Sequence, residues 1–122
     1  MSNKEIVLQA MNELFHEKNG EAIERYWHKA YKQHNPSMTD GHDGLRDLLP
    51  LLDANFKWQP GIIVEQGDIV ITHSQVFGWG PAAVIVADIF RLEDGKIAEH
   101  WDVVQEEVPA SKSASGHPMT SF

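Results

Sequence analysis

The strongest structural signal in the chain is a pair of apolar segments separated by a short polar turn. Residues 82–92 and 96–106 flank the sequence EDG, which is typical of a tight β-hairpin turn. Side chains alternate between the two faces of a strand. Asp88 therefore shares its face with apolar neighbours on the first strand, and His100 shares a face with Asp102 on the second. Such a hairpin predicts an antiparallel sheet with at least one covered face.

The length of the turn decides which side chains stand opposite each other. A three-residue loop, with its glycine in a left-handed bulge, places Asp88 opposite His100 and Asp102 one diagonal step away. A two-residue turn places Asp88 opposite Trp101 instead. We favour the three-residue loop because it gathers three ionisable groups on one face of the sheet.

The opposite face of the hairpin is also apolar in the favoured register, although Arg91 and Glu99 interrupt it. Its apolar members are Ile85, Ala87, Ile89, Ile97, Trp101 and Val103. Two strands with so much apolar surface are not expected to face water on that side. We therefore expect helices to cover one face and a second subunit to cover the other, which predicts a homodimer packed through the sheet.

The N-terminal half predicts three helices. Ser2 and Glu5 have the spacing of a capping box, and the apolar residues that follow them repeat at helical intervals. A second helix is expected over residues 21–30. A third is expected near residues 45–52, with a kink or a restart near Arg46 to Pro50, because Pro50 cannot donate a helical hydrogen bond.

Two further strands precede the hairpin, over residues 58–65 and 69–79. Helices followed by a meander of about four strands predict an α+β fold in which the helices pack on one sheet face. We assign residues 1–108 to a single domain. Residues 109–122 are small, polar and proline-bearing, which is typical of a C-terminal tail.

Composition narrows the chemistry available to this domain. The 122 residues include no cysteine, which excludes disulfides, thiolate metal sites and a thiol nucleophile. The net charge of −8 argues against a nucleic-acid surface. The N-terminus has charged residues where a signal peptide needs an apolar stretch, and no segment is long enough to span a membrane. These features predict a cytoplasmic protein without nucleic-acid or membrane partners.

Two sequence blocks together resemble a known family. YKQHNP at residues 31–36 and DIFRLEDGKIAEHWDVVQ at residues 88–105, in this order, resemble the SnoaL-like polyketide cyclases of the nuclear-transport-factor-2-like superfamily. The resemblance extends from the first helix to about Glu107. It implies a cone-shaped, cystatin-like α+β barrel, with three N-terminal helices packed on the concave face of a curved antiparallel sheet of about four strands.

The resemblance also implies a chemistry. SnoaL-like cyclases close a ring by intramolecular aldol condensation without a metal or cofactor, using a carboxylate on the last strand and a polar residue opposite it. Asp102 stands at the position of that carboxylate, and Asp88 stands at the position of its partner, which is often histidine. The fold also hosts isomerases, dehydratases, and non-catalytic binding or dimerisation modules.

We therefore expect a cofactor-independent enzyme of the cyclase, aldol-condensation or isomerase type, acting on a small hydrophobic carbonyl compound. The alternative is a binding protein or dimerisation module of the same fold. The candidate catalytic residues are Asp102, Asp88 and His100. The candidate ligand-binding residues are His34, His73, Tyr31, Asn35 and Trp101.

Each candidate has a structural alternative. The two aspartates could form buried ion pairs, and the histidines and Tyr31 could be satisfied core or loop residues. The histidines lack the short spacing typical of zinc sites, so we expect no metal.

Overall fold

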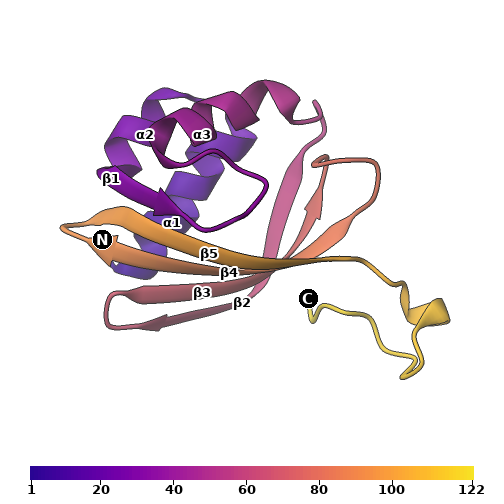
Figure 1. Ribbon diagram of the computed structural model, residues 1–122. Coiled ribbons are helices and arrows are strands. Elements are labelled where there is room, and N and C mark those ends of the chain that lie inside the picture. Colours follow the sequence, from indigo (N-terminus) through magenta and orange to yellow (C-terminus); the bar gives the residue numbers. More distant parts are fainter.

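Three short helices and a five-stranded sheet form two layers in the computed structural model, which describes residues 1–122 (Figure 1). The helices are α1 (Asn3–Met11), α2 (Glu21–Tyr26) and α3 (Gly41–Leu48). One π-helical turn (Asn12–His16) extends α1, and single 3-10 turns lie at Leu49–Leu51 and Ala110–Lys112. The strands are β1 (Trp27–Gln33), β2 (Lys57–Gln66), β3 (Ile69–Phe77), β4 (Val84–Glu93) and β5 (Lys96–Glu106).

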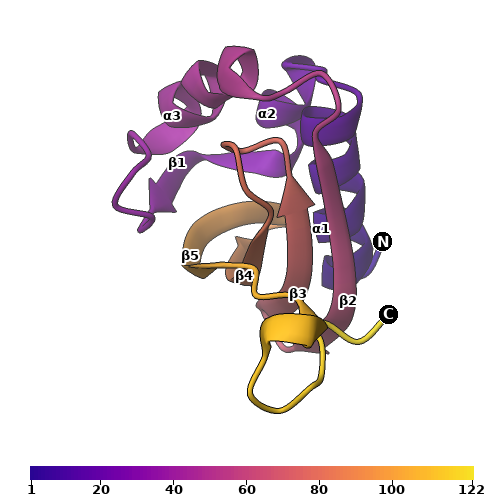
Figure 2. The same cartoon turned by 90° about the vertical axis from the view of Figure 1, so that its right-hand side faces the viewer.

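The sheet has the strand order β1-β5-β4-β3-β2. Strands β2 to β5 form an antiparallel meander, whereas β1 pairs with β5 in parallel. Two views at right angles show the helices gathered on one side of a curved sheet, with the C-terminal tail at the far end (Figures 1 and 2). The predicted α+β architecture is confirmed.

The strand β1 is a correction to the predicted second helix. That helix ends at Tyr26, because the backbone of Trp27 is already extended, with φ −106° and ψ 132°. The apolar residues before it follow helical spacing, and this periodicity runs on through Trp27. The backbone groups of residues 27–33 form hydrogen bonds to β5, and a longer helix would also have given them partners. Only the tertiary structure therefore distinguishes a strand from a helix here. The sheet accordingly has five strands and is mixed.

Two local predictions about the helices are confirmed. The backbone N–H of Glu5 donates to Ser2 Oγ at 3.1 Å, which caps the start of α1. The third helix ends at Leu48, and the chain continues as a 3-10 turn through Pro50. The predicted kink therefore takes the form of a change of helix type.

The hairpin between β4 and β5 follows neither of the two registers considered from sequence. Glu93 pairs with Lys96 across a two-residue turn, in which both Asp94 and Gly95 have positive φ. A β-bulge then inserts Ala98 into β5, because Leu92 pairs with Ile97 while Arg91 pairs with Glu99.

The bulge restores the grouping of ionisable residues that the sequence suggested. Beyond it, Asp88 stands opposite Asp102 and Phe90 stands opposite His100. A two-residue turn alone would have placed Asp88 opposite Trp101, with His100 on the other face. The inserted residue shifts the register by one, so the two aspartates and the histidine share the inner face.

The same bulge corrects the position of Ile97. We expected Ile97 on the outer face, but it is fully buried in the core beside the helices. Before the bulge Ile97 points inward, and after it His100 points inward, an odd number of positions later. The core that surrounds it contains Val7, Leu14, Ile23 and Trp27.

The outer face of the sheet keeps two apolar rows. One row runs across the strands through Val64, Ile71, Ile89 and Trp101, and the other through Ile62, His73, Ala87 and Val103. Val64 and Val103 have exposed fractions of 50% and 71%. The tail beyond β5 returns toward β2, where the ring of Phe122 lies against Gly61.

No helix in the structure is both long enough and apolar enough to cross a membrane.

Replacing Ile97 by alanine should lower the free energy of unfolding by about 3 kcal/mol, because a fully buried side chain leaves a cavity in the core. Urea denaturation followed by circular dichroism measures this change. Leu51→Ala is the matched control, since Leu51 is 74% exposed and its truncation should change stability by less than about 0.5 kcal/mol. Equal effects of the two substitutions would contradict the position of Ile97 in the core.

Candidate functional site

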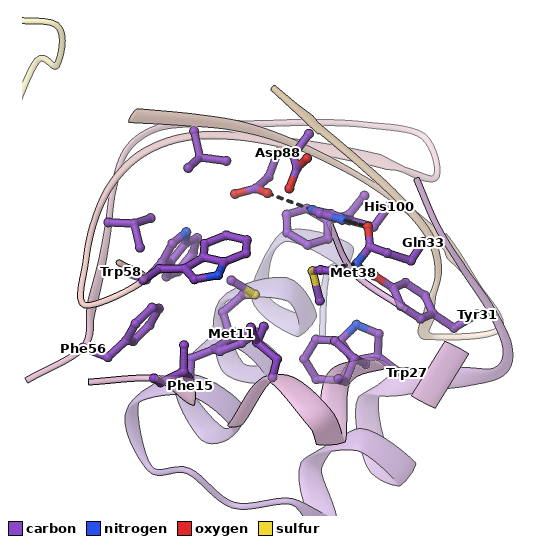
Figure 3. Close-up of a pocket in the computed structure, with 18 residues that line it drawn as sticks. Met11, Phe15, Trp27, Tyr31, Gln33, Met38, Phe56, Trp58, Asp88 and His100 are labelled. Atoms are coloured by element: carbon purple, nitrogen blue, oxygen red, sulfur yellow. Dashed lines mark hydrogen bonds and ion pairs between the residues drawn. The ribbon is translucent and has the colours of Figure 1, made fainter. Parts of the chain in front are cut away.

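A cavity lies between the helices and the inner face of the sheet (Figure 3). Fourteen of its eighteen lining residues are hydrophobic, and its empty volume is about 550 Å³ with its open mouth included. The aromatic part of the wall consists of Phe15, Trp27, Tyr31, Phe56, Trp58, Trp79 and Phe90. Polar side chains enter the cavity from β1, β4 and β5. Apolar walls with a few polar groups are typical of sites for small organic ligands.

The most buried polar pair in the cavity joins Asp88 on β4 to His100 on β5. His100 Nε2 lies 2.8 Å from Asp88 Oδ1, and the exposed fractions of the two residues are 7% and 6%. An unpaired charge or polar group would be costly at this depth, so each group depends on the other. Asp88 and His100 therefore form a dyad that faces the cavity.

A second polar chain continues from the dyad to β1. Gln33 Oε1 lies 2.7 Å from His100 Nδ1, and Gln33 Nε2 donates to the hydroxyl of Tyr31 at 2.8 Å. Burial raises the pKa of Tyr31, and the nearby carboxylates of Asp88 and Asp102 raise it further. Tyr31 is therefore a neutral phenol at physiological pH and a potential hydrogen-bond donor to a ligand.

Asp102 occupies a separate, less buried position in the same cavity. Both of its carboxylate oxygens accept from Asn35 Nδ2, each at 2.9 Å. One ligand atom each from Asp88, His100 and Asp102 lie within 4.8 Å of one another. Two carboxylates and an imidazole so close together can exchange protons with a bound molecule and with each other.

The same three side chains could in principle ligate a metal ion. His100 Nε2 and Asp88 Oδ1 are also at the distance of a hydrogen bond, so the two groups can share a proton. The arrangement of the cavity is thus suited to proton transfer.

Three predicted ligand-binding residues lie outside the cavity, which corrects those predictions. His34 and Trp101 stack on each other on the outer side of β5, with ring centroids 5.0 Å apart and planes at 5°. His73 is also on the outer face, because its neighbours Thr72 and Ser74 are fully buried on the inner face of β3. Strand alternation puts His73 and Trp101 on the side opposite the cavity, and His34, one residue beyond the end of β1, stacks on Trp101 there.

The remaining predicted residues reach the site in different ways. Tyr31 lines the cavity directly, together with Asp88, His100 and Asp102. Asn35 is buried behind the wall and contacts Asp102 rather than the cavity.

Two features of the site escape the sequence prediction. Gln33 is not among the candidates from sequence, because no strand is predicted over its segment. In a strand, Gln33 lies two residues from Tyr31 and points to the same face, and this spacing is the signal that could have found it. Trp58 lines the cavity, and its buried Nε1 has no hydrogen-bond partner, so it is an additional donor next to the cavity.

Comparison with known proteins identifies the fold and a family. Residues 8–100 match the profile of the SnoaL-like domain. A search of curated protein sequences gives no significant match.

Solved structures with this architecture have low sequence identity to the chain. An NTF2-like protein of unknown function from Cytophaga hutchinsonii has a TM-score of 0.73 and 18% identity, over 86% of this chain and 91% of its own. A candidate polyketide cyclase from Acidithiobacillus ferrooxidans has a TM-score of 0.72 and 17% identity, over 85% and 89%. TerC, co-crystallised with polyporic acid, has a TM-score of 0.68 and 19% identity, over 84% and 91%.

Glu99, which holds the outer histidine, should make stability depend on pH. The hydrogen bond from His34 is the main cause that lowers the pKa of Glu99 below its ordinary value of 4.5, and Arg91 lowers it further. A carboxylate whose pKa is depressed by folding stabilises the protein above the ordinary pKa, and this contribution is lost as pH falls through the folded pKa. Glu99→Gln should therefore be less stable than wild type at pH 7.

The difference should shrink as the pH is lowered below 4.5, and urea denaturation at a series of pH values measures it. Glu106→Gln provides a matched control, since Glu106 is an exposed carboxylate near the end of the same strand. A stability difference for Glu99→Gln that stays constant from pH 7 to pH 3 would contradict the role of this ion pair.

Proposed function

The chain belongs to the SnoaL-like domain family, and we propose that it is an enzyme of the cyclase or isomerase type that works by acid–base chemistry. The observation that carries this proposal is the position of Asp102, whose carboxylate faces an apolar cavity within 4.8 Å of a buried Asp88–His100 dyad. Fold likeness alone would not support it, because this architecture hosts many functions.

The proposed reaction begins with removal of a proton from a carbon next to a carbonyl group. One of the carboxylates takes this proton, and the electron pair of the broken C–H bond forms an enolate. The enolate carbon then attacks a second carbonyl of the same molecule, which closes a ring and leaves an alkoxide. A proton returned to that alkoxide completes the aldol addition, with no net loss or gain of atoms. In an isomerisation, the proton returns to a different atom of the enolate.

The neutral hydroxyl of Tyr31 supports the formation of the enolate. Its oxygen accepts from Gln33, so its own proton is available to an oxygen of the substrate. A donor aimed at developing negative charge inside an apolar cavity stabilises the transition state more than it would in water.

The walls define the kind of substrate. Apart from the polar cluster, the cavity is lined by aromatic and aliphatic side chains. A small, flat and largely apolar carbonyl compound fits such a wall, because its rings can pack against the tryptophans and phenylalanines. TerC, which shares the fold, was crystallised with polyporic acid.

Asp102→Asn should abolish the chemistry while leaving the fold intact. The test is exchange of the hydrogens next to the carbonyl of small cyclic and aromatic ketones in deuterated water, followed by NMR. Loss of a positioned acid–base group typically slows such a step by about 10² to 10⁴. Asp47→Asn is the matched control, because Asp47 lies on the exposed side of α3, away from the cavity.

Three results would discriminate the possibilities. Exchange that is catalysed by the wild type and lost in Asp102→Asn supports the enzyme. Exchange that survives this substitution rejects the assignment of Asp102. A wild type that retains a ketone tightly but catalyses no exchange identifies a binding protein of the same fold.

We also propose that the chain forms a homodimer through the outer face of the sheet. The two apolar rows across that face contain partly exposed residues such as Val64 and Ile71, whose exposed fractions are 50% and 39%. Apolar rows of this extent are favourable to bury against an identical face.

Light scattering at micromolar concentration should give a mass of twice 13.8 kDa for the wild type. Ile71→Lys should shift this mass to that of a monomer, since a charge at the centre of an apolar interface would lose its water. Leu51→Lys, on the helical side of the molecule, should leave the mass unchanged. A monomeric wild type would exclude the dimer.

A further inference from the structure

We infer that the segment Gln33–Ser37 holds the two acid–base groups of the cavity in opposite protonation states. Two side-chain amides in this segment face the site, that of Gln33 toward His100 and that of Asn35 toward Asp102. Backbone N–H groups of the same segment fix which end of each amide faces which partner. The assignment of catalytic roles that follows rests on the acid–base function proposed above.

The orientation of the Gln33 amide is set by a backbone N–H, which can only donate a hydrogen bond. The backbone N–H of Asn35 donates to Gln33 Oε1 at 3.1 Å. If the amide were flipped, its NH₂ group would face this N–H, donor against donor. The same oxygen lies 2.7 Å from His100 Nδ1, and an amide oxygen can only accept. Nδ1 of His100 must therefore carry a proton.

The proton on Nδ1 determines the state of the dyad. The other nitrogen of His100, Nε2, lies 2.8 Å from Asp88 Oδ1. Without a second proton, a nitrogen lone pair would face a carboxylate oxygen across this short contact, which is repulsive. One proton therefore lies between Nε2 and Oδ1, whether it is bound to the imidazole or to the carboxyl group. The dyad can therefore donate the proton that lies between Nε2 and Oδ1.

Asn35 has the opposite effect on Asp102. The backbone N–H of Ser37 donates to Asn35 Oδ1 at 2.7 Å, so this amide is also held in one orientation. Its Nδ2 therefore faces Asp102 and donates to both carboxylate oxygens, at 2.9 Å each. Donors on both oxygens favour the ionised form. Asp102 is thus an unprotonated base.

These states assign the two steps of the proposed reaction. Asp102 takes the proton from carbon, and the dyad gives its proton to the alkoxide oxygen. After these two steps Asp102 is protonated and the dyad has lost its proton. Transfer of one proton from Asp102 to the dyad, over less than 4.8 Å, restores the resting enzyme. Groups whose surroundings favour opposite protonation states are the usual basis of acid and base assignments. Gln33 and Asn35 are positioning residues, since they act through His100 and Asp102.

NMR of protein with ¹⁵N-labelled histidine tests the role of Gln33 without any substrate. His100→Asn identifies the signals of His100 among those of the seven histidines. In the wild type, Nδ1 of His100 should be protonated. Gln33→Met, which has similar length but no amide, should release the ring to the form that is protonated on Nε2 and bare on Nδ1.

Gln33→Glu is the conservative rescue, because a carboxylate can still accept from both Asn35 N–H and His100 Nδ1. It should keep the proton on Nδ1. Lys32→Met is the matched control, since Lys32 is exposed on the same strand and should leave His100 unchanged. A bare Nδ1 in the wild type, or an unchanged ring in Gln33→Met, would overturn the inference. If Gln33→Met fails to fold, the wild type and Gln33→Glu still decide it.

The Asn35 half is tested with ¹³C-labelled aspartate. The carboxyl carbon of Asp102 should give the signal of an ionised group at neutral pH, and Asn35→Leu should move this signal toward the protonated position. Ser37→Ala keeps the backbone donor and should change nothing. A protonated Asp102 in the wild type would overturn this half. If the protonation states are as inferred but no ketone exchanges hydrogen, the inference stands and the acid–base function is rejected.

Discussion

One additional residue in β5 determines both the core and the site. Ala98 is inserted opposite the Arg91–Leu92 step of β4, so the alternation of side chains changes phase at this point. Ile97 can therefore be buried among the helices while His100 and Asp102 point into the cavity. In a regular strand the positions of Ile97 and His100 would lie on opposite faces, and the sheet would have to give up either core packing or its polar cluster.

The polar cluster is tolerated in an apolar cavity because nearly every group in it has a partner. Asp88 is paired with His100, His100 with Gln33, and Asp102 with Asn35. Buried polar groups of this kind are stable only as a connected network. The network begins on β1, the strand that the helical periodicity did not predict. It ends at Asn35 and Ser37, in the loop that follows this strand. The edge strand of the sheet thus supports the chemistry of the two central strands.

Family membership and site geometry contribute different kinds of knowledge. The SnoaL-like profile and the structural likenesses establish the family and its α+β architecture. At identities below 20% these likenesses carry the fold alone. The functional proposal rests instead on hydrogen-bond distances within the cavity, and on the fact that two amides in one short segment present opposite ends to two titratable groups.

The sequence by itself determined the α+β class, the boundaries of β5 and the capped start of α1. These features depend on local periodicity, capping and turn chemistry, which neighbouring residues specify. The tertiary structure decided the strand β1, the bulge at Ala98 and the outward positions of His34, His73 and Trp101. A bulge shifts the phase of a strand without leaving a mark in its composition. Pairing between β1 and β5 joins residues about 70 positions apart, so no local pattern records it. The same long-range pairing brings Gln33 to His100, the contact on which the proposed assignment of acid and base rests.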